Sequence, residues 1–221
     1  MLKNFSFRAG NEIVKSKFKI KILGTWIQND LRMDAEINKL ASTLHNRINN
    51  INKITKFTDF KSRLNFINGF VIGKLNYMIP LYNKLPQYLN LKLHKIMMTA
   101  ARAAIGSYCF RKSTYYILNK CKWLHINNLI KYRCLSFLHN ILTNKSPKSI
   151  IDIYRKNRFE RHKNDIATNY VPKNIRYTKF FIYDHINTYN KLSIDIKSKS
   201  TKIFKKELRL WIQSQPEDTM D

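Results

Sequence analysis

Three lysines at alternate positions near the start of the chain are followed closely by a Leu-Gly pair. The lysines are Lys17, Lys19 and Lys21, and the pair is Leu23 and Gly24. Alternate residues of a β-strand lie on one face, so the three ammonium groups would form a row. Glycine tolerates positive φ and carries no Cβ, which lets another molecule approach the backbone closely. We therefore expect this row and this turn to contact the phosphates of a nucleic acid.

Basic side chains that would add phosphate contacts recur farther along the chain. Those that we expect to bind nucleic acid are Arg47, Lys53, Lys56, Arg102, Arg111 and Lys112. Tyr115, Tyr116 and Tyr132 are candidates for stacking on bases, although such aromatics more often pack within a protein. Lysine and arginine contacts to phosphates carry little sequence information, so binding with little preference for base sequence is expected.

The acidic residues predict no catalytic site in this chain. Two-metal catalysis needs carboxylates that hold Mg²⁺ ions close together, and the chain contains no Asp-Asp pair. The carboxylates are scattered, and we expect them to serve as helix caps and surface partners. Examples are Asp30, Asp34, Glu36, Asp59 and Asp152. We therefore expect no catalytic residue and no cofactor here.

Histidines and cysteines do not form a metal-binding pattern either. The six histidines include no His-x-x-x-His pair, and the cysteines, Cys109, Cys121 and Cys134, are too far apart for a Cys-x-x-Cys zinc arrangement. We expect no metal site. An odd number of cysteines and the lack of an apolar segment after Met1 favour an intracellular location, nuclear or cytoplasmic.

The composition favours a folded protein that binds a polyanion. The 221 residues include 41 Lys and Arg and 14 Asp and Glu, which gives a formal charge of +27. Apolar residues make up 44% of the chain, enough for a core, and 13% are aromatic, more than basic disordered tails contain. Polar residues and Pro80 interrupt the longest apolar stretch, at 64–82, so a membrane span is not expected.

The periodicity predicts a mainly α fold with a short N-terminal β-hairpin. Residues 1–30 alternate like strands, with the apolar face of 17–22 buried, and 31–106 read as a three-helix bundle. In residues 107–215 we expect further helices around a basic loop at 155–177. Residues 216–221 are expected to form a frayed tail. The first expected helix begins at about residue 34 and runs for about five turns. The second covers 59–79 and is closed by Pro80. The others cover 86–105, 113–121, 126–142, 178–192 and 201–213.

The order of these elements resembles the primer-grip, thumb and C-terminal region of non-LTR retrotransposon reverse transcriptases. Almost the whole chain is covered by short matching segments. They are Lys-Ile-Leu-Gly at 21–24, residues 64–77, Ala-Arg-Ala-Ala-Ile-Gly at 101–106, Trp-Leu-His-Ile at 123–126, Tyr-Asn-Lys-Leu-Ser at 189–193 and Phe-Lys-Lys-Glu-Leu at 204–208. The sequence departs from the family pattern at Ile22, where an aromatic is usual, and at His125 and Ser193, where proline is usual.

The resemblance implies that Leu23 and Gly24 help to hold a primer strand, with Lys19 and Lys21 beside them. The helices that follow would form a thumb on a template–primer duplex of RNA and DNA. The catalytic palm of the family, with its Phe/Tyr-x-Asp-Asp turn and Mg²⁺, has no counterpart in this sequence. A separate palm-containing polypeptide would then be a partner of this chain.

Three interpretations remain open at this point. The chain is a non-catalytic nucleic-acid-binding fragment, a truncated gene model of an active RNA-directed DNA polymerase whose palm lies upstream, or a co-opted basic helical module that binds another protein. An in-frame Phe/Tyr-x-Asp-Asp in the genomic sequence just upstream would favour the second interpretation.

Overall fold

The computed structural model describes residues 6–10, 12–15, 17–30, 32–54, 57–106, 112–143, 147–148 and 181–215. Within these ranges the chain is mainly helical, with short antiparallel strands only near the N-terminus, so the predicted fold class is confirmed. The expected loop at 155–177, the tail at 216–221, Lys56 and Arg111 lie outside the described residues. The expected domain boundaries stay predictions.

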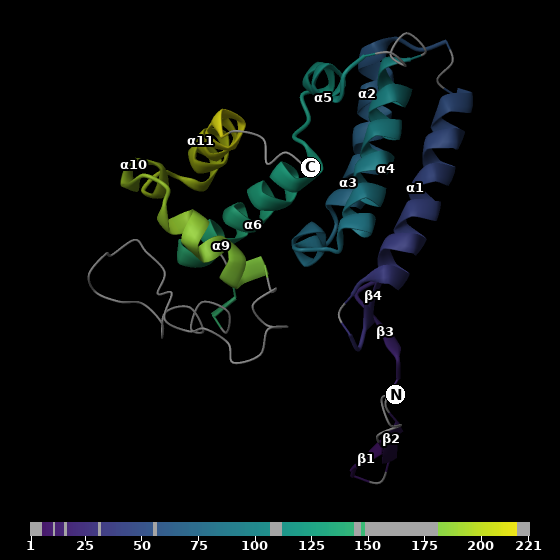
Figure 1. The fold of residues 1–221 in the computed structure, drawn as a ribbon, viewed down its shortest axis with the longest axis vertical. Helices are drawn as coiled ribbons and strands as arrows, with labels where there is room; N and C mark the ends of the chain where they lie inside the picture. Colours follow the sequence, from purple (N-terminus) through teal and green to yellow (C-terminus); the bar gives the residue numbers. More distant parts are fainter. Residues whose placement is uncertain are drawn as a thin grey trace.

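The N-terminal strands form two separate hairpins. Strand β1 (Ser6–Ala9) pairs with β2 (Glu12–Lys15), and β3 (Lys19–Ile22) pairs with β4 (Thr25–Gln28). Figure 1 shows the first hairpin apart from the helices and the second at the start of helix α1. The expected burial of the apolar face of β3 is wrong, because β4 is the strand that packs against α1 and every residue of β3 is exposed.

The long helices of the first half lie side by side as a bundle (Figure 1). They are α1 (Asp34–Ile54), α2 (Phe60–Ile67) continued by α3 (Gly73–Asn76), and α4 (Gln87–Ile105). Helix α1 buries the apolar stripe that its three- and four-residue spacing predicts, from Ile37 to Ile51. Ile67 of α2 and Leu93 of α4 are buried in the same cluster as the apolar stripe of α1, so these helices share one core.

The second helix is interrupted and ends earlier than predicted. A π-helical turn, η1 (Asn68–Ile72), joins α2 to α3, and α3 ends at Asn76. Met78 then adopts a left-handed conformation with φ 58°, which a continuing helix does not allow. Pro80 lies inside the following 3₁₀ turn, η2 (Ile79–Tyr82), so its expected role in closing the helix is wrong.

Helix α4 ends where the sequence predicts, before Gly106. This glycine has φ 95°, in the region that residues with a Cβ avoid. Arg63 of α2 donates a hydrogen bond from Nε to the carbonyl oxygen of Ala104, at 3.1 Å, and so occupies one of the carbonyls of the last turn that lack a helical partner. The C-terminus of α4 is thus fixed to α2.

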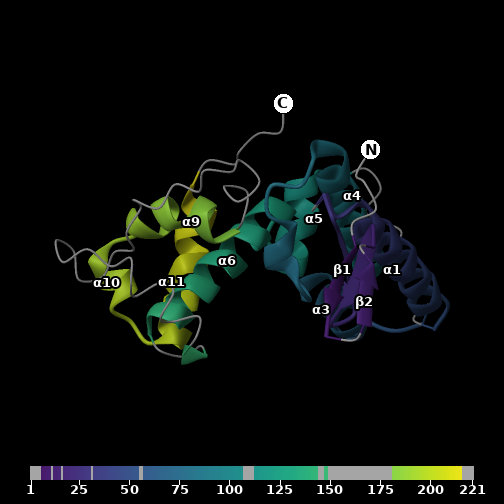
Figure 2. The same cartoon turned by 90° about the horizontal axis from the view of Figure 1, so that it is seen from below.

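The second half of the molecule is built on α6 (Ile126–Leu142), which has the predicted bounds. Before it comes α5 (Thr114–Cys121), which is capped by Ser113 and lies within the expected range 113–121. After it come α9 (Phe181–Asn190), α10 (Ile194–Lys197) and α11 (Thr201–Ser214). The short helix α10 was not expected. Helices α9 and α11 pack on α6 around Leu135, Tyr189 and Phe204, which form a second, smaller core. Figure 2 shows α6 between the two groups of helices.

The helices of the described residues include none that is both long and apolar enough to cross a membrane.

We predict that Leu93→Ala lowers the free energy of unfolding by about 2 to 5 kcal/mol. The side chain is fully buried in α4, so its loss removes apolar burial and leaves a cavity. The matched control is Leu91→Ala on the same helix, where the side chain is 38% exposed. Urea unfolding followed by far-ultraviolet circular dichroism measures both, and equal losses in the two variants would contradict the assignment of this core.

Candidate nucleic-acid interface

The turn between β3 and β4 presents its backbone to solvent. Ile22 stands opposite Thr25 in the ladder, which leaves Leu23 and Gly24 as a two-residue loop. Both have positive φ, 48° and 86°, as a type I′ hairpin turn requires. Gly24 adopts this conformation without steric cost, whereas leucine rarely does. The Leu23 side chain is 74% exposed, so both the turn and its one apolar side chain are open to a ligand.

A tyrosine from the helical bundle fixes this turn in place. The hydroxyl of Tyr77, directly after α3, donates a hydrogen bond to the carbonyl oxygen of Leu23 at 2.6 Å. The Lys74 ammonium lies 5.1 Å from the centre of the Tyr77 ring, close enough for a cation–π interaction. The turn is therefore attached to a residue 54 positions away in the sequence.

The strand β4 is held by side chains from both sides of the junction with α1. Gln28 accepts a hydrogen bond from the backbone N–H of Ala35 at 2.7 Å, in the first turn of α1, where N–H groups lack helical partners. The Glu36 carboxylate accepts one from the backbone N–H of Trp26 at 2.8 Å. Glu36 is buried, so its expected place on the helix surface is wrong. Burial follows from its role as the acceptor for β4.

A buried tyrosine completes the surroundings of the Glu36 carboxylate. Tyr82, in η2, is 2% exposed and hydrogen-bonds to Glu36. Burial, and then the negative charge of Glu36, raise the pKa of the Tyr82 hydroxyl well above its ordinary value. The hydroxyl therefore stays protonated and remains a donor to the carboxylate.

One lysine of the hairpin and one lysine of α1 lie over the same tryptophan. Lys21 stands opposite Trp26 and Lys19 opposite Gln28, so these four side chains share a face of the hairpin. The ammonium groups of Lys19 and of Lys39, on α1, lie 5.1 and 5.5 Å from the centre of the Trp26 ring. Lys17, just before β3, is exposed like Lys19 and Lys21. Residues 17–28 include no carboxylate of their own, and the Glu36 carboxylate that bonds to Trp26 is buried, so the exposed charges of the hairpin are positive.

Two of the other predicted residues lie on α1, away from the turn. Arg47 is half-buried, and its Nη1 donates to the carbonyl oxygen of Phe70 in η1 at 2.7 Å, which gives it a structural role. Lys53 is exposed near the far end of α1, about 28 Å along the helix from Asp34. The structure therefore does not bring Lys53 to the hairpin.

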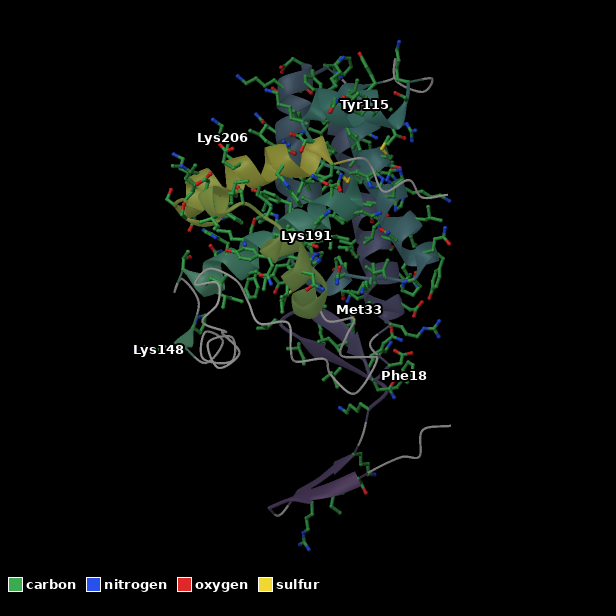
Figure 3. The ribbon with its side chains drawn as sticks, turned by 60° about the vertical axis from the view of Figure 1, so that its left-hand side comes forward. Phe18, Met33, Tyr115, Lys148, Lys191 and Lys206 are labelled. Carbon is green, nitrogen blue, oxygen red and sulfur yellow. The ribbon has the colours of Figure 1, made fainter. Side chains whose placement is uncertain are left out.

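The remaining two predicted residues are also distant from the hairpin. Arg102, in the last turn of α4, is half-buried, and its Nε has no hydrogen-bond partner among the described residues. Lys112 is exposed before α5, with its ammonium 5.6 Å from the Tyr116 ring. In Figure 3, Tyr115 of α5 lies at the end of the bundle opposite Phe18, which precedes β3. The tyrosines of α5 therefore form no part of the hairpin surface.

Sequence reasoning missed Trp26, Lys39, Lys74 and Tyr77 as members of this surface. The alternation along β4 places Trp26 beside the lysine row, and this signal was present in the sequence. The contact of Tyr77 with Leu23 had no such signal, because nothing local links residues so far apart.

The described residues include no group of three or more His, Cys, Asp or Glu side chains that could hold a metal ion. Cys121 and Cys134 are buried in the larger core, where they pack as small apolar side chains. The arrangement at the hairpin offers cations, aromatic rings and an open turn, which suit the binding of phosphates.

We predict that Tyr82→Phe weakens the loss of stability at alkaline pH. In the wild type, the unfolded state loses the Tyr82 proton above about pH 10 while the folded state keeps it, so the free energy of unfolding falls as the pH rises. At neutral pH the variant should lose about 1.5 to 3 kcal/mol, because a hydrogen bond to a charged group disappears. The control is Tyr115→Phe on the exposed face of α5. Urea titrations from about pH 8 to pH 11 measure the slopes, and an unchanged slope in Tyr82→Phe would contradict the assignment.

Comparisons of this chain with protein families, with curated proteins and with solved structures found no match.

Proposed function

We propose that this chain binds the backbone of a template–primer duplex of RNA and DNA, as a non-catalytic, thumb-like fragment of a non-LTR retrotransposon reverse transcriptase. The observation that carries the proposal is the β3–β4 hairpin. It combines three exposed lysines, a turn held in place by Tyr77, and the absence of carboxylates from residues 17–28. The resemblance of the sequence to the primer-grip region of that family supplies the role.

The lysine row acts on the phosphates as a set of point charges. Each ammonium group donates up to three hydrogen bonds without a fixed direction, so the row suits any base sequence. Binding releases the counterions condensed on the nucleic acid, which makes the affinity fall with rising salt concentration. Gly24 lets one strand come close to the backbone of the turn, and Tyr77 keeps that backbone from moving away.

The chemistry of polymerisation belongs to another part of the enzyme in this proposal. The described residues lack the acidic cluster that Mg²⁺ would need, so no step of nucleotide addition is assigned to them. The exposed apolar side chains of the hairpin, Ile20 and Ile22, favour a palm-containing polypeptide as the partner that covers them. An intracellular location, nuclear or cytoplasmic, would follow from this role.

A second candidate is a protein-interaction module, and the same exposed apolar side chains favour it. In that case the charged hairpin would contribute adhesion only. The two candidates differ in what the lysine row does, so the row is the place to test them.

We expect Lys19→Glu with Lys21→Glu to weaken binding to an RNA–DNA duplex strongly. The salt slope, d log K/d log[salt], is negative, and its magnitude should decrease by about 2, because each of the two ammonium groups would otherwise displace counterions from one phosphate. Fluorescence anisotropy with a labelled duplex at several salt concentrations measures both quantities. The control is Lys202→Glu with Lys206→Glu on α11, which changes the net charge equally on another element (Figure 3 labels Lys206).

Two outcomes would overturn the proposed function. One is a wild-type affinity that does not change with salt, since phosphate contacts require such a change. The other is an equal loss in the hairpin variant and the α11 variant, because net charge alone would then explain the binding.

A further inference from the structure

Exposed aromatic side chains form a stripe along α2, η1 and α3. Phe66, Phe70, Lys74 and Tyr77 follow one another at spacings of four, four and three residues, which places them on one side of the helical segment. The three aromatics are 42%, 56% and 44% exposed. We call these four residues the aromatic stripe.

The packing behind the stripe keeps its rings on the surface. Ile67 and Val71, each next to a phenylalanine of the stripe, are fully buried in the larger core and so fix the rotation of the helix. Arg47 binds the carbonyl oxygen of Phe70 from α1 and fixes the π-helical turn. The apolar rings therefore stay in water when the chain is alone, which costs free energy unless a ligand covers them.

The two phenylalanine rings of the stripe are nearly parallel. The rings of Phe66 and Phe70 are inclined by only 14° to each other, with centroids 6.4 Å apart. One end of the stripe reaches the candidate interface directly, because the Tyr77 hydroxyl binds the Leu23 carbonyl. A ligand that follows the hairpin can thus continue onto these rings without leaving the surface.

The charges beside the stripe select the class of ligand. The helical segment carries Lys61, Arg63 and Lys74, with Asp59 as the carboxylate at its N-cap, and Arg63 is bonded to the carbonyl of Ala104. The neighbouring hairpin residues 17–28 contain no carboxylate of their own. The ligand must therefore combine negative charge with flat apolar rings. An unpaired stretch of nucleic acid has both, because its phosphates are anionic and its base faces are open for stacking on aromatic side chains. A duplex offers only the phosphates, since its base faces are covered by neighbouring base pairs.

We propose that the aromatic stripe stacks the bases of a single-stranded segment that adjoins the bound duplex. The inference rests on the proposed function and extends the same surface. The hairpin lysines hold duplex phosphates, and Phe66 and Phe70 take unpaired bases beyond them.

The experiment compares three labelled ligands with the full chain by fluorescence anisotropy. They are a blunt RNA–DNA duplex, the same duplex with a short single-stranded extension, and the same extension with abasic sugars, which keeps the number of phosphates. We expect the extension with bases to bind about tenfold more tightly than the abasic one, in the range of base–aromatic stacking.

The variants separate stacking from other effects. Phe66→Leu with Phe70→Leu should bring the two extended ligands to equal affinity and leave the blunt duplex unchanged, whereas Phe66→Tyr with Phe70→Tyr should keep the difference. Phe57→Leu is the matched control, because Phe57 is 99% exposed and lies outside the stripe. Circular dichroism verifies that the variants, all at exposed positions, fold as the wild type does.

The failure of this inference is distinguishable from the failure of the proposed function. Equal wild-type affinities for the two extended ligands, together with salt-dependent binding of the blunt duplex, overturn the inference and leave the function. No binding of the blunt duplex overturns both. A wild type that sediments as a dimer, and becomes monomeric on Phe66→Leu with Phe70→Leu without any effect of bases, overturns the inference by assigning the stripe to a second copy of the chain.

Discussion

A single buried carboxylate, that of Glu36, determines where the charged hairpin lies. A carboxylate removed from water is stable only when hydrogen bonds replace its hydration. Here the backbone of Trp26 and the hydroxyl of Tyr82 supply them. The two donors belong to β4 and η2, while Glu36 belongs to α1, so one anion joins three elements. The position of the lysine row relative to the bundle depends on this junction.

Several cations of this protein lie over aromatic rings. Basic residues outnumber acidic ones, 41 to 14, and among the described residues Arg32 forms a salt bridge with Asp34, at 3.9 Å. Lysines instead lie over Trp26, Tyr77, Tyr116 and Trp211. A ring attracts a cation without neutralising its charge. These lysines therefore keep their positive charge, which suits a protein that attracts polyanions.

Local patterns predicted most of the helices, and long-range contacts account for what they missed. The apolar period of α1, the Ser113 cap of α5 and Gly106 after α4 each act within a few residues, so the sequence alone indicates them. The early end of α3 is accompanied by the contact of Tyr77 with Leu23, and the buried Glu36 contacts Trp26 and Tyr82, which are distant in the sequence. Of the candidate site, the lysine row and the turn were predictable from alternation. The ring that anchors the turn was not, since it comes from a distant part of the chain.

Helix α6 belongs to both hydrophobic cores, and two adjacent residues in the middle of this helix belong to different cores. Cys134 is buried in the larger core and Leu135 in the smaller one, so the two cores pack against different sides of the same helix. Arg209 of α11 also donates to the carbonyl oxygen of Lys122, which ties the smaller core to the entrance of α6. The smaller core is therefore joined to the bundle at two places, through the shared helix α6 and through the contact of Arg209 with Lys122.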